Sequence, residues 1–124
     1  MAASCHDLDH PGFNNIYMIE KRDMIAVRYN DVSVLENHHV ASSFAILSEP
    51  QYNVTKSFPK DKYKRFRKIM IDAILATDMS HHFAKFGIFK GKILSEDLDP
   101  KAPSEKHILC QELFHLADIS NSTK

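Results

Sequence analysis

The strongest folding signal in this chain is a helical stripe of apolar side chains within residues 60–80, KDKYKRFRKIMIDAILATDMS. Side chains three, four or seven positions apart share one face of an α-helix, so the stripe would be buried while the opposite face meets water. By contrast, apolar and polar residues alternate over no long stretch, as they would in a half-buried strand. We therefore predict an all-α fold. The stripe consists of Tyr63, Phe66, Met70, Ile74 and Thr77.

Further helices are predicted on both sides of this stripe. Residues 15–29 favour two short helices separated near Asp23, and residues 33–48 favour one longer helix. Ser33 followed by Glu36 three positions later is a capping-box pattern, which marks the start of the longer helix. The remaining predicted elements are a loop at 50–59, a helix at 80–90, a loop at 95–104 and a helix at 105–118.

Composition excludes several classes of protein. The 124 residues include 16 basic and 16 acidic side chains, and this balance argues against a nucleic-acid binder that neutralises phosphates. No apolar run approaches the roughly 20 residues that span a bilayer, and the start lacks the basic and apolar regions of a secretory signal. We therefore expect no membrane span and a cytoplasmic location, where Cys5 and Cys110 would be free thiols. The basic residues of the segment 60–68 are interpreted as a solvated helix face.

Histidines and carboxylates crowd the segment CHDLDHPG, residues 5–12. Imidazole and carboxylate groups are ligands of zinc, iron, manganese and magnesium, so His6 and Asp7 are candidate metal ligands, although an isolated His-Asp pair is common. His10 lies four positions after His6 and would share its face on a continuing helix. Because Pro11 disfavours helical backbone at the residue before it, we expect the helix to end near His10.

Three further polar groups follow along the chain. LENHH places Glu36 and His38 on one helical turn, which is either part of a site or a polar surface turn. Asp78 is expected to end the amphipathic helix. Asp118, in FHLADISN, follows an apolar helical stretch that should be buried, and a buried carboxylate is costly unless it is paired or binds metal. His115 would then be either a core histidine or a support of the site.

In this order the groups closely resemble the catalytic domain of class I cyclic-nucleotide phosphodiesterases. The resemblance covers essentially all 124 residues and implies the multi-helix catalytic fold of that family, of the HD-domain type. The family signature H-D-x-x-H-x-G-x-x-N, followed two positions later by an apolar residue, is met by His6, Asp7, His10, Gly12, Asn15 and Tyr17.

The resemblance also implies a site with two divalent metals, Zn²⁺ together with Mg²⁺ or Mn²⁺. Matching the family residue by residue assigns metal ligands to His6, Asp7 and Asp118, with Asp7 bridging both metals. The positions that hold the waters of the metals or orient their ligands are matched by His10, Glu36, His38 and Asp78. Asn15 matches a support of the site, and Asn121 matches a wall of the nucleotide pocket.

The activity implied is hydrolysis of cyclic AMP or cyclic GMP to the 5′-monophosphate in signalling, with the cyclic nucleotide as partner and a homodimer as a common assembly. The family's H-N-x-x-H-A-x-D-V stretch, with a general acid and a fourth zinc ligand, has no match in the chain. We therefore expect residues 1–124 to be the central part of one catalytic domain, incomplete at both ends. Two alternatives stay open: a catalytically incomplete remnant that binds or regulates, and an HD-type hydrolase of other phosphate esters.

Overall fold

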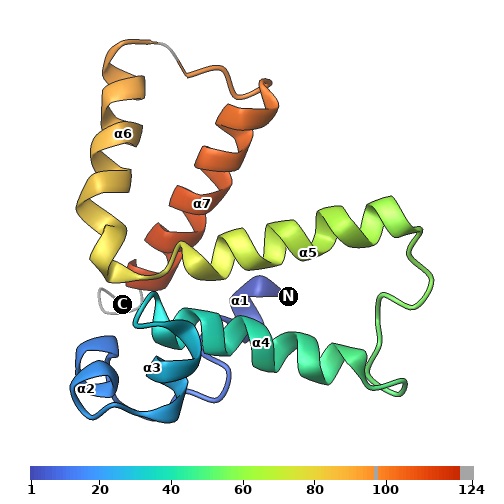
Figure 1. The fold of residues 1–124 in the computed structure, drawn as a ribbon. Helices are drawn as coiled ribbons and strands as arrows, with labels where there is room; N and C mark the ends of the chain where they lie inside the picture. Colours follow the sequence, from blue (N-terminus) through green and yellow to red (C-terminus); the bar gives the residue numbers. More distant parts are fainter. Residues whose placement is uncertain (97, 121–124) are drawn as a thin grey trace. The chain divides into compact units, whose positions relative to one another are not determined.

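The computed structural model describes residues 1–96 and 98–120, and every regular element in those ranges is a helix (Figure 1). The all-α prediction is confirmed. The chain divides into two compact units, Met1–Leu75 and Ala76–Lys124. In the first unit the elements are α1 (Ala2–Cys5), α2 (Asn15–Glu20), α3 (Met24–Tyr29), α4 (Val34–Ser48) and α5 (Lys60–Leu75). In the second they are the 3-10 helix η1 (Met79–His81), α6 (His82–Leu94) and α7 (Pro103–Ile119).

The first unit is organised around α4 and α5, which run side by side in opposite directions and are joined by the predicted loop at 50–59 (Figure 1). Of the predicted stripe, Met70 and Ile74 are buried and Phe66 packs against them. The prediction that this helix buries an apolar face is therefore confirmed for these three residues. Burial of each large apolar side chain contributes about 1.5–3 kcal/mol. Tyr63 is 39% exposed, however, and Thr77 lies beyond the end of α5.

The helix α1 is held against this core. Ala2 and Cys5 pack on the cluster that Val40 and Phe44 of α4 form with Met70 and Ile74 of α5. The helix ends at Cys5, and the chain then turns, so the expectation that helix continues to near His10 is wrong. The residue Asp9 adopts a left-handed backbone with φ 61°, which a helix cannot contain. The segment after α1 is therefore a loop anchored at its beginning.

A second core cluster joins α2 and α3 to the start of α4. Its buried members are Met18, Ala26, Val34 and Leu35. The two short helices predicted for residues 15–29 are confirmed, and Asp23 separates them because its side chain caps α3 by accepting the Ile25 N–H at 3.0 Å.

The capping box predicted at the start of α4 is wrong. Ser33 has a left-handed backbone with φ 41°, and its side chain makes no capping hydrogen bond. A capping box requires an extended N-cap residue, from which the hydroxyl reaches into the first turn. The N–H of Leu35 in that turn instead donates to Asn15 Oδ1 at 2.9 Å. The helix is thus capped by a side chain from α2.

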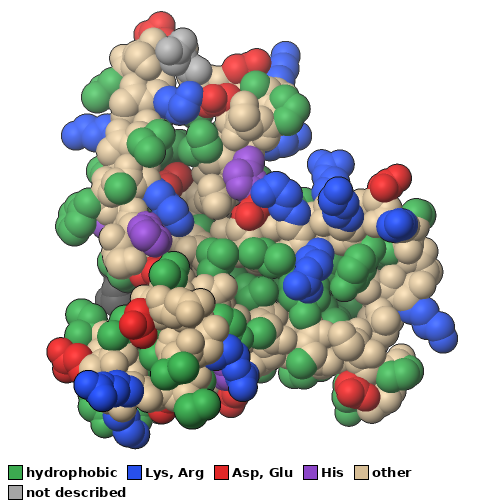
Figure 2. All heavy atoms as spheres, viewed as in Figure 1, with side chains coloured by type: hydrophobic (Ala, Val, Ile, Leu, Met, Phe, Trp, Pro, Cys, Tyr) green, Lys and Arg blue, Asp and Glu red, His purple; other side chains and the backbone are tan. Residues whose placement is uncertain are grey.

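The predicted solvated face on α5 is confirmed, and Figure 2 shows Lys and Arg side chains gathered over this helix. Some of these cations also contact their own fold: Arg67 lies 4.2 Å from the Phe44 ring centroid, and Lys68 pairs with Asp72 at 2.8 Å. The exposed basic residues are Lys60, Lys62, Lys64, Arg65, Arg67 and Lys68.

In the second unit, α6 and α7 correspond to the helices predicted at 80–90 and 105–118, and they pack on each other. Asp78 does not end the amphipathic helix, because α5 ends at Leu75 and Asp78 caps η1. The expectation of a buried apolar face on α7 is also wrong. Leu113 and Leu116 are exposed, whereas the polar Glu112 and His115 are buried. No described helix in the chain has the length and apolar character needed to cross a membrane.

Candidate metal and catalytic site

The first candidate ligand, His6, follows α1 directly and is oriented by that helix. Its Nδ1 lies 2.9 Å from the carbonyl oxygen of Ala3. Because a carbonyl can only accept, Nδ1 carries a proton and donates to Ala3, which leaves Nε2 directed away from α1. Metal-binding histidines are commonly oriented in this way, with the second ring nitrogen donating to a backbone carbonyl.

The outer ring nitrogen of His6 faces a carboxylate. His6 Nε2 lies 3.3 Å from Asp7 Oδ2, and the Asp7 side chain is 67% exposed. A cation, either a proton on Nε2 or a metal ion, would bind to both atoms. Imidazole nitrogen and carboxylate oxygen are both ligands of Zn²⁺ and Mn²⁺, so the donor set fits a divalent metal.

His10 closes the segment with a defined tautomer of its own. The backbone N–H of Gly12 donates to His10 Nδ1 at 2.9 Å, so this nitrogen accepts and the proton of the neutral ring lies on Nε2. Gly12 has φ 82°, a backbone conformation that favours glycine, and it allows the chain to fold back toward the ring. His10 is therefore prepared as a hydrogen-bond donor through Nε2.

Two histidines of α4 connect this segment to the helix. His38 Nε2 donates to Asp9 Oδ2 at 2.8 Å, and His39 Nδ1 donates to the carbonyl oxygen of Leu8 at 2.7 Å. His39 is 2% exposed, and burial lowers its pKa below the usual value for histidine. Both contacts join residues about thirty positions apart, and they bring the HDLDH segment and the LENHH turn together.

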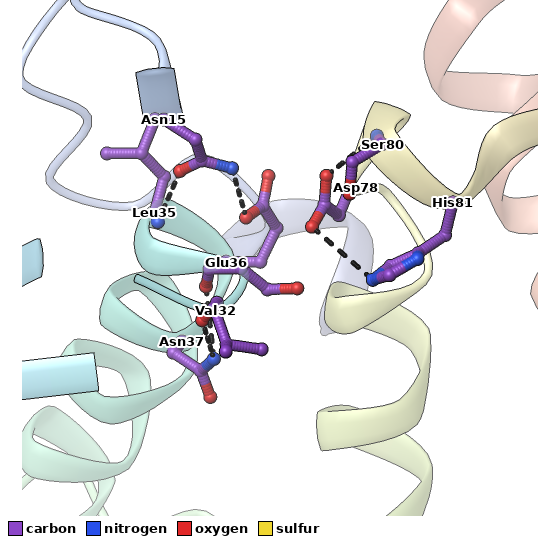
Figure 3. A network of polar contacts seen from close by, with 9 residues as sticks. Asn15, Val32, Leu35, Glu36, Asn37, Asp78, Ser80 and His81 are labelled. Carbon is purple, nitrogen blue, oxygen red and sulfur yellow. Dashed lines mark hydrogen bonds and ion pairs between the residues drawn. The ribbon is translucent and has the colours of Figure 1, made fainter. Parts of the chain in front are cut away.

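Glu36 is held by Asn15, the residue that also caps α4. Asn15 Nδ2 donates to Glu36 Oε2 at 3.0 Å while Asn15 Oδ1 accepts from the Leu35 N–H, as Figure 3 shows. One amide thus fixes both the start of the helix and the direction of its carboxylate. The predicted role of Asn15 as a support agrees with this geometry.

Asp78 is buried in the second unit, with 4% of its surface exposed. Its carboxylate accepts the Ser80 N–H at 2.8 Å and lies 3.9 Å from His81 Nε2 (Figure 3). These contacts offset part of the cost of burying a charged carboxylate. The position of Asp78 follows from its role as the N-cap of η1.

Asp118 lies near the end of α7 and is half-buried. One turn earlier, His115 Nε2 lies 2.7 Å from His82 Nδ1 of α6, so one ring donates to the other. Burial, and secondarily the neighbouring His82, lowers the pKa of His115. The pair ties the start of α6 to the part of α7 that carries Asp118.

The structure thus ties the HDLDH segment to α4 through His38 and His39 and fixes Glu36 through Asn15 in the first unit, and it places Asp78 and Asp118 in the second. No cluster of three or more His, Cys, Asp or Glu side chains arranged to hold a metal occurs in the described ranges. Asp118 as a third ligand stays a prediction. Asn121, predicted in the nucleotide pocket, lies outside the described residues.

Sequence reasoning grouped Asp9 and His39 with the candidate residues around them but assigned no role to either, and it did not expect His39 to be buried. Asp9 stands inside the quoted cluster, and its signal was the same as that of its neighbours. His39 lies four positions after Leu35, so helical periodicity places both on the buried face of α4. That spacing would have indicated that His39 is more deeply buried than the half-buried His38.

Known proteins are similar to this chain over nearly its whole length. The sequence model of the family described as 3′5′-cyclic nucleotide phosphodiesterase matches residues 1–124. The human "High affinity cGMP-specific 3′,5′-cyclic phosphodiesterase 9A" is 47% identical over 99% of this chain and 20% of its own length. The fruit-fly (Drosophila melanogaster) "High affinity cAMP-specific and IBMX-insensitive 3′,5′-cyclic phosphodiesterase 8" is 40% identical over 100% of this chain and 14% of its own length.

A solved structure is similar as well. The phosphodiesterase domain of the RhoPDE fusion protein from the choanoflagellate Salpingoeca rosetta superimposes with a TM-score of 0.92 and 37% identity. The match covers 97% of this chain and 38% of that one. This chain belongs to the 3′,5′-cyclic nucleotide phosphodiesterase family. It spans about a fifth, or less, of the length of the curated relatives described above.

Proposed function

We propose that this chain contributes to an enzyme that hydrolyses a cyclic nucleoside 3′,5′-phosphate to the 5′-monophosphate. The observation that carries the proposal is the His6–Asp7 pair, whose Nε2 and Oδ2 atoms lie 3.3 Å apart in a chain that matches the family throughout. Relatives with names that specify cyclic GMP and cyclic AMP both align over nearly the whole chain, which supports a cyclic nucleotide as substrate.

Family membership supports the use of divalent metal ions, and we propose Zn²⁺ together with Mg²⁺ or Mn²⁺. The residues that would hold them are His6, Asp7 and Asp118. When bound, paired divalent metals lower the pKa of water and stabilise charge on phosphoryl oxygens. The orientation of His6 supports this assignment, because Nδ1 donates to the Ala3 carbonyl and Nε2 faces Asp7.

The other residues would orient water and substrate. His10 would donate from Nε2 to an oxygen in the site, since its Nδ1 already accepts the Gly12 N–H. Glu36, fixed by Asn15, and Asp78 would accept protons or hydrogen bonds from water, while His38 would hold the HDLDH segment through Asp9. Asn121 is proposed to contact the nucleotide. In the reaction a water oxygen bonds to phosphorus, the P–O3′ bond breaks, and O3′ takes up a proton.

The experiment is to incubate the full-length protein with cyclic AMP and with cyclic GMP and to quantify the 5′-monophosphate formed. We expect turnover that a chelator abolishes and added Mn²⁺ restores. Binding of a cyclic nucleotide without turnover would favour the alternative of a catalytically incomplete remnant. Hydrolysis of simple phosphate esters but not of cyclic nucleotides would favour the other alternative, a different HD-type hydrolase.

Two further expectations belong to this proposal. Cys5 and Cys110 are free thiols, which supports a reducing, cytoplasmic location. Cell fractionation tests that location. The homodimer implied by the family resemblance stays a prediction, and sedimentation of the full-length protein tests it.

A further inference from the structure

The backbone that carries the metal-ligand pair is tied to α4 at one peptide group. Leu8 stands between Asp7 and Asp9, and its carbonyl oxygen accepts from His39 Nδ1 at 2.7 Å. The side chains around this peptide are exposed: Asp7, Asp9 and His10 all face solvent. The His39 ring, by contrast, is 2% exposed. The loop is thus fixed from its inner side by a buried histidine.

The hydrogen bond defines the protonation of His39. A carbonyl oxygen only accepts, so Nδ1 must carry a proton. Burial lowers the pKa of His39, which keeps the ring neutral near pH 7 with its single proton on Nδ1. The ring also stacks on His10, with ring centroids 5.6 Å apart and planes inclined by 22°. His39 therefore contacts the segment both before and after Asp9.

A second tie reaches the same loop, and its contribution is expected to be smaller. The ion pair of His38 with Asp9 is largely exposed on the Asp9 side, at 72% of that side chain. Exposed ion pairs contribute little to stability, because water screens their charges. Loss of the buried His39 donor would leave the Leu8 carbonyl without that partner, and an unpaired carbonyl away from water is costly. The partly buried hydrogen bond of His39 is therefore the stronger constraint.

The loop needs such a constraint because it contains a strained position. Asp9 has φ 61°, a left-handed backbone that is unfavourable for L-residues, although aspartate adopts it more readily than most. The hydrogen bonds within the loop, from Leu8 N to Cys5 O and from His10 N to Asp7 O, are long at 3.2 Å each. Short-range contacts alone hold this backbone weakly. The contacts from α4 compensate for the strain.

We propose that His39 is a positioning residue for the metal-ligand pair: by holding the Leu8 carbonyl, it keeps the Asp7 carboxylate close to His6 Nε2. In this role His39 would act on the metal ligands through the backbone at Leu8 and would not itself bind the metal or the substrate. The inference rests on the proposed function, because it takes from it that His6 and Asp7 bind a divalent metal.

The test compares four variants of the full-length protein by their affinity for Mn²⁺ and Zn²⁺, measured by competition with a chromophoric chelator, and by their melting temperature after metal removal. His39→Leu keeps the volume and removes the donor. His39→Gln introduces an amide N–H donor but places it away from the Nδ1 position. His39→Asn places its amide nitrogen near that position. The matched control is Val40→Ala, because Val40 is the adjacent buried residue and belongs to the apolar cluster between α4, α5 and α1.

We expect His39→Leu and His39→Gln to lower metal affinity about 10–100-fold, as loss of a residue that orients a metal ligand typically does. We expect His39→Asn to recover most of this loss. Val40→Ala should lower the melting temperature and leave metal affinity within about threefold of wild type, since the valine side chain makes no hydrogen bond to the Leu8 carbonyl or to the ligand side chains. If His39→Leu does not fold, His39→Gln and His39→Asn still form the decisive comparison.

The outcomes separate the inference from the function beneath it. Wild-type metal affinity in His39→Leu or His39→Gln, with melting temperatures lowered as in Val40→Ala, would show that His39 only stabilises the fold. Equal losses in His39→Asn and His39→Gln would likewise overturn the role of the Nδ1 donor. A wild-type protein that binds neither metal would refute the proposed function itself, and with it the inference.

Discussion

Replacement of Asn15 by alanine would remove two hydrogen bonds with one change. Asn15 Oδ1 accepts the Leu35 N–H at 2.9 Å, and Asn15 Nδ2 donates to Glu36 Oε2 at 3.0 Å. Loss of a helix cap costs about 0.5–2 kcal/mol, and loss of a hydrogen bond to a charged group costs about 1.5–3 kcal/mol. Glu36 is only half-buried, so water recovers part of the second loss. We expect Asn15→Ala to lower the free energy of unfolding by about 2–3 kcal/mol.

The neighbouring Asn14 supplies a matched control. Its side chain caps α2 by accepting the Tyr17 N–H at 2.9 Å, and Asn14 is exposed. Asn14→Ala therefore removes a single cap and should cost about 1 kcal/mol. Urea unfolding of the full-length protein, followed by circular dichroism, compares the two variants. The midpoint should fall at least twice as far for Asn15→Ala, with an unchanged slope.

The bridging role of Asn15 can be separated from its role as a cap. In a double-mutant cycle with Glu36→Gln, the coupling between the two residues should be 0.5 kcal/mol or more, roughly the lower bound for residues in contact. Equal losses for Asn15→Ala and Asn14→Ala, together with no coupling to Glu36, would refute the reasoning that one amide fixes both the helix start and the carboxylate.

Three other predictions address metal, surface and pH. Asp118→Ala should abolish metal retention and turnover by removing a proposed ligand, and wild-type zinc content in that variant would contradict the assignment. Lys64→Ala should change stability by no more than about 0.5 kcal/mol and leave turnover intact, because Lys64 is exposed on α5; a large loss of turnover would show that the basic face has a further role. Burial lowers the pKa of both His39 and His115 in the folded protein, so the unfolded chain binds protons at higher pH. The contribution of these histidines to the free energy of unfolding should be fully present above the unfolded pKa of about 6.5 and be lost as pH falls through their lowered pKa values in the folded protein. The melting temperature of His115→Gln should therefore depend less steeply on pH than that of wild type. An equal dependence would contradict this account.

Local pattern was sufficient to predict the helices and to nominate candidate metal ligands. The apolar stripe that includes Met70 and Ile74 predicted α5, since helical periodicity is a property of residues three and four positions apart. The short segment from His6 to His10 predicted candidate metal ligands for the same reason, because their chemistry and spacing can be read within one turn. The family resemblance rested on the order of four such short motifs, and the comparisons confirmed the family.

What the sequence alone could not determine were the contacts between distant segments. Local rules predicted that Ser33 would cap α4, but Asn15 does so, because the packing of α2 brings its amide to the first turn. The leucines of α7 suggested a buried apolar face, yet His115 turns inward to meet His82. His39 reached the Leu8 carbonyl in the same way, across 31 positions.

The residues that form the fold's elements were thus determined by the sequence, and the partners of its polar side chains were decided by tertiary structure. A helix forms from interactions within four residues, so its pattern is written locally. A buried polar group must find a partner wherever packing supplies one, and neither Asn15 nor His39 has that partner within its own helix.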